Sequence, residues 1–253
     1  MATRLKDKVA LVTGGGSGIG RAVALALSGE GAIVVVAGRR AEPLEETVGL
    51  IEQGGGVGNA QVTDVSVSAD VERLVAVAVE RHGGLDIACN NAGTVGLGAP
   101  LDEISEEVWA EVMSINLTGT WLCMKHEIAY MRQHGGGSIV NVGSNIGMHV
   151  TRPRMGAYAA SKAGVSVLTR TAAIECIDDG IRVNAVSPGA TDTPLSFRPG
   201  ETHEDRARRI QEVIPIGRLG AVEEIAAAVL WLASPEAEFV VGQDFVLDGG
   251  ASV

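Results

Sequence analysis

The sequence predicts an α/β fold in which a doubly wound, parallel β-sheet is covered by helices on both faces. Short β-branched segments alternate with helical stretches, which is typical of parallel sheets. One of these segments, residues 33–37, is apolar throughout, as a strand covered on both faces must be. A glycine-rich segment also joins the first apolar segment to the first helical stretch. The chain has 253 residues, and we expect a single domain over residues 1–253.

About seven strands are expected. Glycine runs at 54–56 and 135–137 are expected where helices end and turn into strands, because glycine accepts a positive φ. Two long helices are expected, after the fourth and fifth strands, over 105–133 and 156–178. The strands are expected at 9–12, 33–37, 57–62, 85–89, 138–142, 181–186 and 245–247.

Composition excludes several classes of function. A formal charge of −11 disfavours nucleic acid and anionic membranes as partners. The N-terminus is charged where a signal peptide is apolar, and no apolar segment reaches membrane-spanning length. The three cysteines have no C-x-x-C spacing and the five histidines have no ligand spacing, so reduced thiols and no metal site are expected. We therefore expect a soluble, cytoplasmic protein.

The glycine-rich segment at residues 13–20 reads TGGGSGIG and lies between an expected strand and an expected helix. Glycines let the backbone approach a pyrophosphate, whose charge then meets the free amides and positive dipole of the helix start. The alternative is a plain turn, since glycines make turns anywhere. The position between a strand and a helix favours a nucleotide site.

Tyr158 and Lys162 stand four residues apart, which places a phenol and an ammonium one helical turn from each other. A free phenol has a pKa of about 10. A neighbouring ammonium favours the phenolate and is expected to bring this pKa towards neutrality. The pair can then exchange a proton near pH 7. The alternative is a surface lysine beside a half-buried tyrosine.

With these two motifs, the chain resembles the short-chain dehydrogenases/reductases over nearly its whole length. Five further landmarks of that family follow in the expected order: Asp64, the segment 90–93 (NNAG), Asn116, Ser144 and the segment 188–193 (PGATDT). The resemblance implies a Rossmann-like fold and an NAD(P)H-dependent oxidoreductase. Its substrate would be a small molecule with a ketone or secondary alcohol. It also implies a homotetramer that uses the helices 105–133 and 156–178 and the strand 242–248.

The resemblance further implies four catalytic residues. Tyr158 would protonate the carbonyl oxygen while the pro-S hydride passes to the carbonyl carbon, and Ser144 would hold that oxygen. Lys162 would lower the pKa of Tyr158 and bind the nicotinamide ribose, and Asn116 would hold a water that links Lys162 to solvent. The alternatives are a strand-end cap for Ser144, a helix residue bonded to its own turn for Asn116, and an exposed charge for Lys162.

Cofactor contacts are implied along the same edge of the sheet. Asp64 and Val65 would border the adenine, and Asn91, Ala92 and Gly93 would line the nicotinamide riboside. Turn chemistry is the alternative for Asn91, and helix capping for Asp64. The other implied contacts are Gly14, Ser17, Gly18, Ile19, Gly20, Tyr158, Lys162, Pro188, Gly189, Thr191 and Thr193.

Cofactor choice is expected to depend on the end of the second strand. An acidic residue there would bind the ribose hydroxyls of NAD(H) and exclude a 2′-phosphate. The sequence has Arg39 and Arg40 instead, and a guanidinium pairs with a phosphate in two-pronged fashion. We expect NADP(H), with Arg39 as the main ligand and Arg40 as a helper. Ser17 stands where several NADP-preferring relatives have a basic residue, so NAD(H) stays open.

The segment 192–216 resembles the lid that closes over substrate in this family. The arginines at 206, 208 and 209 are expected on a solvated helix face. The segment 145–157 is expected to shape the substrate pocket, where His149 either binds substrate or is an exposed loop histidine. The runner-up activity is a 3-oxoacyl-thioester reductase. Two other classes are weighed: a dinucleotide sensor without turnover, and a lyase-like relative in which an arginine replaces the lysine.

Overall fold

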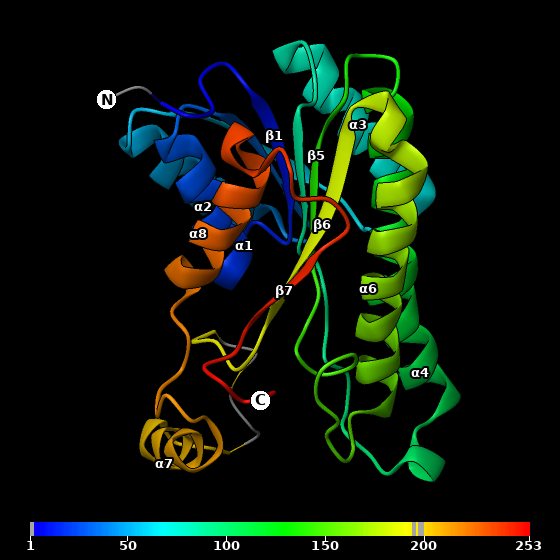
Figure 1. Cartoon of the computed structure of the whole chain (residues 1–253). Helices are drawn as coiled ribbons and strands as arrows, with labels where there is room; N and C mark the ends of the chain where they lie inside the picture. Colours follow the sequence, from blue (N-terminus) through cyan, green and yellow to red (C-terminus); the bar gives the residue numbers. More distant parts are fainter. Residues whose placement is uncertain (1–2, 194–195, 197–199) are drawn as a thin grey trace.

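The computed structural model describes residues 3–193, 196 and 200–253. Seven parallel strands form one sheet in the order β3-β2-β1-β4-β5-β6-β7 (Figure 1). The prediction of a doubly wound parallel sheet is therefore confirmed. The strands are β1 (Val9–Thr13), β2 (Ile33–Gly38), β3 (Val57–Val62), β4 (Ile87–Asn90), β5 (Gly137–Val142), β6 (Ile181–Pro188) and β7 (Asp244–Leu247).

Helices cover both faces of the sheet. Figure 1 shows α1 (Gly18–Gly29), α2 (Ala41–Gln53) and α8 (Val222–Ala233) on one face. The other face is covered by α3 (Ser68–His82), α4 (Glu106–Met113), α5 (Gly119–Met131) and α6 (Gly156–Cys176). The helix α7 (His203–Val213) lies apart from both layers, near the loops that follow β6.

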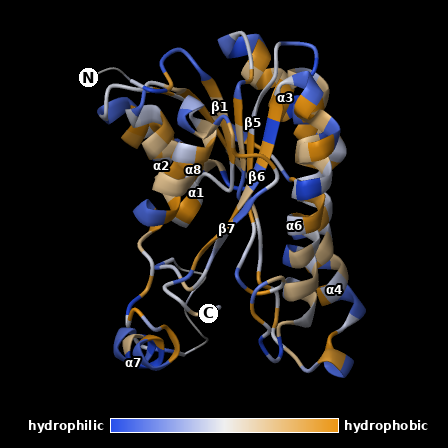
Figure 2. Cartoon of the chain, viewed as in Figure 1, coloured by the Kyte–Doolittle hydropathy of each residue, from blue (hydrophilic) through white to orange (hydrophobic). Residues whose placement is uncertain are grey.

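Apolar strands explain why both faces are covered. All five residues of β1 are buried, and so are the four central residues of β2. One apolar core lies between the sheet and the helices α1 and α8, and a second lies under α3, α5 and α6. Figure 2 shows the hydrophobic colour concentrated in the strands and on the inner faces of these helices. The outermost strand β3 is less covered, since Val57 and Val62 are exposed.

The strand order brings the carboxyl ends of β1 and β4 together at one end of the sheet. The chain builds β1, β2 and β3 outward, then returns to β4 on the other side of β1. In such sheets a crevice forms at the carboxyl ends of the strands where the order reverses. The loops that follow β1, β4, β5 and β6 all leave from this edge. They carry Ser144 and the segments 91–93 and 189–193, while Tyr158 and Lys162 lie in α6.

One helix departs locally from the expected pattern. The stretch 105–133 is not a continuous α-helix, because a π-helical turn, Ser114–Thr118, separates α4 from α5. Such turns widen the backbone ring by one residue and often occur at functional sites. Asn116 lies at the middle of this turn. None of the described helices is long and apolar enough to cross a membrane.

Candidate active site

The glycine-rich loop after β1 has a shape that side chains would block. Gly14 and Gly18 have positive φ values of 66° and 52°. A Cβ atom added at Gly14 would lie 2.6 Å from Asn91 Nδ2, and one at Gly18 would lie 3.3 Å from Thr193 Cγ2. Ser17 stands at the N-cap of α1, and in the described part of the chain its side chain makes no capping hydrogen bond. The first-turn amides of α1 are thus not capped by a side chain.

Side chains behind this loop hold its carbonyl groups. Arg21 in α1 donates to Gly16 O at 2.6 Å, and Thr47 in α2 donates to Gly15 O at 2.9 Å. Arg21 also pairs with Glu46 at 2.6 Å. Side chains of α1 and α2 thus hold two carbonyls of the loop without a ligand. The sequence analysis missed both contacts, since neither residue lies in the motif that they support.

The β4 loop is tied to the glycine loop by Asn91. Its side-chain amide donates to Thr13 O at 3.0 Å and to Gly14 O at 3.3 Å. The Thr13 hydroxyl in turn accepts from the backbone amides of Asn91 and Ala92, at 3.0 and 3.1 Å. These bonds join the carboxyl ends of β1 and β4. Gly93, the next residue, is exposed at the mouth of the crevice.

Charged groups border the loop on the side of β2 and β3. Arg39 and Arg40 are both exposed, and Arg40 is the N-cap of α2. Hydrogen bonds from Ser66 hold the pKa of Asp64 below its usual value, and the charge of Arg39 lowers it further. Asp64 therefore makes the turn that leads into α3 and also faces Arg39. Val65 is buried with Val71 and residues of α5.

Tyr158 and Ser144 come together at the carboxyl end of β5. Ser144 follows the strand by two residues, and Tyr158 lies in the first turn of α6. Burial raises the pKa of Tyr158, and a hydrogen bond from the Ser144 hydroxyl lowers it by a smaller amount. The prediction that Lys162 brings this pKa towards neutrality is therefore wrong for the chain alone. Desolvation of the phenolate outweighs the stabilising contacts that this arrangement provides.

Lys162 is buried one turn further along α6. Its exposed fraction is 5%, and its ammonium donates to the carbonyl oxygen of Val142 at 2.7 Å. Burial lowers its pKa from 10.5 to about 8. The interpretation of Lys162 as an exposed charge is therefore excluded. A Cβ atom added at Gly93 would lie 3.5 Å from Lys162 Nζ, so this ammonium lies next to the β4 loop.

Asn116 is fully buried and links the β4 loop to α6. Its side-chain amide donates to Thr94 O at 2.8 Å and to Ser161 Oγ at 3.0 Å, and its Oδ1 accepts from Thr94 N at 2.8 Å. Its backbone carbonyl accepts from the Thr120 hydroxyl at 2.7 Å. The side chain is thus used within the fold. The expected role of Asn116 in holding a water stays a prediction.

The segment after β6 closes the crevice from the other side. Pro188 ends the strand, and its carbonyl accepts from Asn145 N at 3.0 Å. Gly189 packs so closely on Asp248 that an added Cβ would lie 2.5 Å from the Asp248 Cβ. Thr191 is buried, and its hydroxyl donates to Gly189 O at 3.1 Å. Thr193 lies over Gly18 and so brings this segment against the glycine loop. Ile19 packs into the core beneath, and Gly20 is buried.

The expected lid, residues 192–216, contains α7. Five residues of the lid, 194–195 and 197–199, lie outside the described residues. The prediction that the arginines of this helix are all solvated is wrong. Arg206 is buried and pairs with Asp192 at 2.8 Å, and Arg209 pairs with Glu201 at 2.6 Å. These pairs fasten α7 to the chain around it. Arg208 is exposed, as expected for a solvated face.

A buried polar network crosses the sheet beside the site and was not expected. Glu127 in α5 accepts from Asn90 Nδ2 at 2.9 Å, and the same amide donates to Asn141 Oδ1 at 3.0 Å. Asn141 then donates to Thr169 in α6 at 2.9 Å. Burial raises the pKa of Glu127 from 4.5 to about 7. Asn90 Oδ1 is buried and has no partner among the residues that the structure describes.

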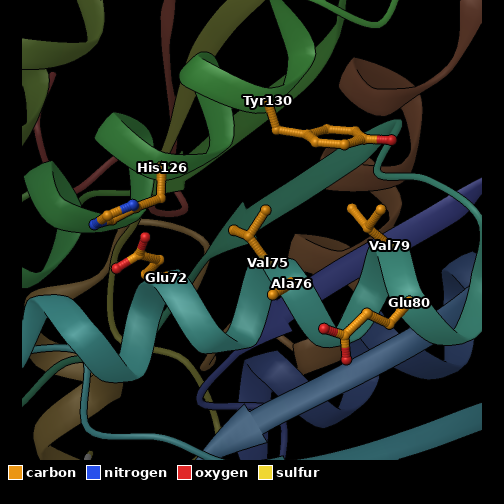
Figure 3. A pocket seen from close by; sticks show the side chains of 7 residues that line it. All are labelled: Glu72, Val75, Ala76, Val79, Glu80, His126 and Tyr130. Carbon is orange, nitrogen blue, oxygen red and sulfur yellow. The ribbon is translucent and has the colours of Figure 1, made fainter.

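A groove of about 340 Å³ lies elsewhere, between α3 and α5. Figure 3 shows its lining, in which valine and alanine side chains of α3 lie opposite His126 and Tyr130 of α5, with Glu72 and Glu80 also on α3. None of the predicted site residues lines it. Among the described residues, no cluster of histidine, cysteine or carboxylate side chains could hold a metal ion.

The residues of the crevice fit a nicotinamide dinucleotide. Added Cβ atoms would fill the space along Gly14 and Gly18, and the start of α1 offers amides that suit a diphosphate. Two exposed arginines stand at the ribose end of the crevice. At the ends of β4 and β5, the buried Lys162 ammonium lies beside Gly93, and the Tyr158 phenol bonds the Ser144 hydroxyl. This distribution matches a cofactor that has phosphates in its middle and a reactive ring at one end.

Comparisons with known proteins agree with this site. Residues 14–252 match the family model described as Enoyl-(Acyl carrier protein) reductase. The chain is 40% identical to 3beta-hydroxysteroid dehydrogenase 1 of Eggerthella lenta, over 98% of this chain and 95% of that protein. It is 41% identical to cis-4-hydroxycyclohexanecarboxylate dehydrogenase of Sinomonas cyclohexanicum, over 99% and 98%.

A solved structure gives the same result. The crystal structure of levodione reductase superposes with a TM-score of 0.94 at 37% identity, and the match covers 98% of this chain and 99% of that one. The likeness thus extends over sequence, fold and length together. The chain belongs to the short-chain dehydrogenase/reductase family, the NAD(P)-dependent oxidoreductases that act on CH–OH donors.

Proposed function

We propose that this enzyme interconverts a secondary alcohol and a ketone on a small ring, with NADP(H) as its preferred cofactor and Tyr158 as the general acid and base. The observation that carries the proposal is the hydrogen bond between Tyr158 and Ser144, with the buried Lys162 one turn further along α6. Two elements, the loop after β5 and the helix α6, place these groups at the carboxyl end of the sheet. The bound nicotinamide would supply or accept the hydride.

The raised pKa keeps Tyr158 protonated at neutral pH, which is the state that a proton donor needs, and Ser144 and Lys162 would have to offset it for the proton to leave. A phenol that stays protonated at neutral pH can give its proton to a carbonyl oxygen as negative charge grows there. Ser144 already bonds the phenol, so its hydroxyl is within reach of the same oxygen. A donor aimed at that oxygen stabilises the transition state. In the alcohol-oxidising direction, Tyr158 takes the proton instead.

Lys162 would act on the phenolate that is left after proton transfer. A buried ammonium stabilises a nearby anion far more than an exposed one would, because little water screens it. Its lowered pKa, about 8, also makes it able to exchange a proton near neutrality. The Asn116 carbonyl would hold the water that passes this proton to solvent. Lys162 would additionally bind the nicotinamide ribose.

Arg39 and Arg40 support the choice of NADP(H). Both guanidinium groups are exposed at the end of β2, and Arg39 faces Asp64. An acidic residue that would exclude a 2′-phosphate is absent from this position of the sequence. The cofactor would otherwise be held by the residues named in the sequence analysis, from the glycine loop, the β4 loop and the segment 188–193. NAD(H) use stays open as the alternative.

Two relatives suggest the substrate class. Their names refer to a hydroxyl group on a steroid and on a cyclohexanecarboxylate, and both are therefore ring alcohols. A ring alcohol of this kind is the substrate class that we propose, with the segments 145–157 and 192–216 closing over it. The second candidate is a 3-oxoacyl-thioester reductase. The matching family model is described as an enoyl-(acyl carrier protein) reductase, which shares the acyl-thioester substrate class but reduces a C=C bond instead of a ketone.

The test is a panel of substrates assayed with NADPH and NADH on the wild type and on Tyr158→Phe. The panel contains cyclohexanone, cyclohexanol, a 3-ketosteroid and an acetoacetyl thioester. We expect turnover of a ring substrate with NADPH and its loss in the variant. Turnover of the thioester alone would favour the second candidate. Tight cofactor binding without turnover of any panel member would favour a dinucleotide sensor.

We also propose a homotetramer, and the expected cytoplasmic location stays a prediction. Large apolar side chains are exposed on the helices that the resemblance assigns to the interfaces. Trp109 is 41% exposed, Trp121 47% and Ile174 78%. Light scattering should give a mass near four chains for the wild type and a smaller mass for Ile174→Glu. A monomeric wild type would contradict this proposal.

A further inference from the structure

The segment after Ser144 forms a tight turn that rests on α6. Gly147 N donates to Val150 O at 2.9 Å, and Val150 N donates to Asn145 O at 2.7 Å. Gly147 has a φ of 133°, and a Cβ atom added there would lie 2.8 Å from Ala159 O and 3.0 Å from Ala163 N. The turn therefore lies against the stretch of α6 that holds Tyr158 and Lys162.

The far end of this turn is held by a buried carboxylate. Asp244 Oδ2 lies 3.2 Å from His149 Nε2, and the Asp244 side chain is 7% exposed. The same carboxylate accepts from the Ser166 hydroxyl and from the Ser187 hydroxyl, each at 2.6 Å. A carboxylate oxygen accepts hydrogen bonds, so His149 presents its Nε2–H to it. His149 is thus the third donor to one buried group.

The acceptor and the two serine donors come from three different parts of the fold. Asp244 begins β7, Ser187 lies in β6, and Ser166 lies in α6 one turn beyond Lys162. Buried carboxylates are costly unless hydrogen bonds satisfy them, so this cluster is a fixed point of the structure. His149 ties the loop after β5 to this cluster. The near end of the turn is held separately, by Asn145 donating to Asp248 at 3.1 Å.

We propose that His149 is a positioning residue, whose hydrogen bond to Asp244 fixes the turn and through it the Ser144 hydroxyl. The mechanical link is short, because Ser144 Oγ accepts from Ile146 N at 3.1 Å within the same turn. A shift of the turn would move the atom that bonds Tyr158. The inference rests on the proposed role of Ser144 in holding the carbonyl oxygen. His149 acts through the turn and not directly on the phenol or the ammonium.

The test compares His149→Ala, His149→Gln, Asp244→Asn and the double variant His149→Ala/Asp244→Asn. Steady-state kinetics with NADPH and the best ketone would be normalised to cofactor-binding sites counted by NADPH fluorescence. His134→Ala is the matched control, since His134 is exposed just before β5 begins, at the opposite edge of the sheet. The carbonyl substrate KM and kcat are then compared with the NADPH Kd.

We expect His149→Ala to lower kcat/KM for the ketone about 3- to 10-fold, the range for one lost hydrogen bond, without changing the NADPH Kd. His149→Gln retains an N–H donor and should recover most of this loss. The double variant should be no worse than the poorer single variant, because both changes break the same contact. Ketone kcat/KM within twofold of wild type in His149→Ala, no recovery in His149→Gln, or additive effects would overturn the proposal.

A second measurement does not depend on turnover. Arg154 is exposed in the segment that follows the turn, so trypsin cleavage after it reports how firmly the segment is held. We expect His149→Ala to be cut there several times faster than the wild type, and His149→Gln and His134→Ala to be cut at the wild-type rate. Equal cutting of all four proteins would overturn the positioning role. A wild type that binds NADPH and reduces no ketone would instead overturn the proposed function.

Discussion

The ammonium of Lys162 donates to the carbonyl oxygen of Val142 at 2.7 Å, two residues before Ser144. This bond joins the middle of α6 to the end of β5. It holds a buried cation at the point where β5 passes into the loop that carries Ser144. Burial lowers the pKa of this cation to about 8, so the fold bears a cost to keep it there. Such a cost is typical of groups retained for function.

The first prediction separates the function of Lys162 from its effect on stability. Lys162→Met removes a buried charge and keeps most of the side-chain volume. We expect turnover to fall at least about 100-fold. We also expect the Tm at pH 7 to rise, by about 2–4 °C for each kcal/mol of desolvation relieved. Calorimetry and a NADPH-linked assay measure the two effects. Exposed Lys6 gives the control, Lys6→Met. Retained turnover would contradict the role of Lys162.

The second prediction concerns the shape of the glycine loop. Gly14→Ala should weaken NADPH binding about tenfold or more, because the new Cβ meets Asn91 and the φ of 66° is strained for alanine. Gly49→Ala is the matched control. An added Cβ at Gly49 meets nothing within 4 Å, and it lies within α2, where alanine is favoured by up to about 1 kcal/mol. Fluorescence titration compares the two. Equal NADPH Kd values would exclude a tight fit at Gly14.

The third prediction follows from the buried carboxyl of Glu127, whose pKa is raised from 4.5 to about 7. Between these pH values the folded chain holds a proton that the unfolded chain releases. Stability from this group is therefore present below about pH 4.5 and is lost as the pH rises to about 7. Glu127→Gln should remove this loss, which is at most about 3 kcal/mol.

Urea unfolding at pH 5.5 and pH 8 provides the measurement. The free energy of unfolding of Glu127→Gln, relative to wild type, should be higher at pH 8 than at pH 5.5. The exposed Glu223 in α8 offers the control variant Glu223→Gln. Its free energy of unfolding relative to wild type should be the same at pH 5.5 and at pH 8. A Glu127→Gln difference that does not change between the two pH values would show that Glu127 titrates normally.

The fourth prediction tests cofactor preference. Arg39→Asp should lower kcat/KM for NADPH and raise it for NADH, because a carboxylate repels the 2′-phosphate and accepts from the ribose hydroxyls. We expect the ratio of the two values to change by about 100-fold or more. Arg40→Asp should change it less, since Arg40 is the expected helper. An unchanged ratio in both variants would mean that neither arginine binds the phosphate.

The fold was largely predictable because its signals are local. Apolar strands such as β1 and β2, and the glycines after them, identify a doubly wound sheet without knowledge of any long-range contact. The family motifs then located Ser144, Tyr158 and Lys162 at one end of that sheet. The π-helical turn around Asn116 was not predictable, because its sequence is compatible with a regular helix.

The electrostatics of the site were less predictable than its location. Spacing places Tyr158 near Lys162, and it does not reveal how deeply both are buried, which decides the direction of their pKa shifts. The Asp244 cluster was missed for a related reason: its members are separated by up to 95 residues and belong to no motif. The same holds for Glu127 and Asn141, and for the pairing of Arg206 with Asp192 in the expected lid.

The most direct test of the account is the single-turnover rate of NADPH oxidation by Tyr158→Phe, measured with a saturating ring ketone. NADPH binding would be titrated in the same sample. We expect an NADPH Kd within about threefold of wild type and a rate lower by about 10² to 10⁴-fold, the usual contribution of a general acid. A rate within threefold of wild type, with NADPH bound, would contradict the claim that Tyr158 transfers the proton.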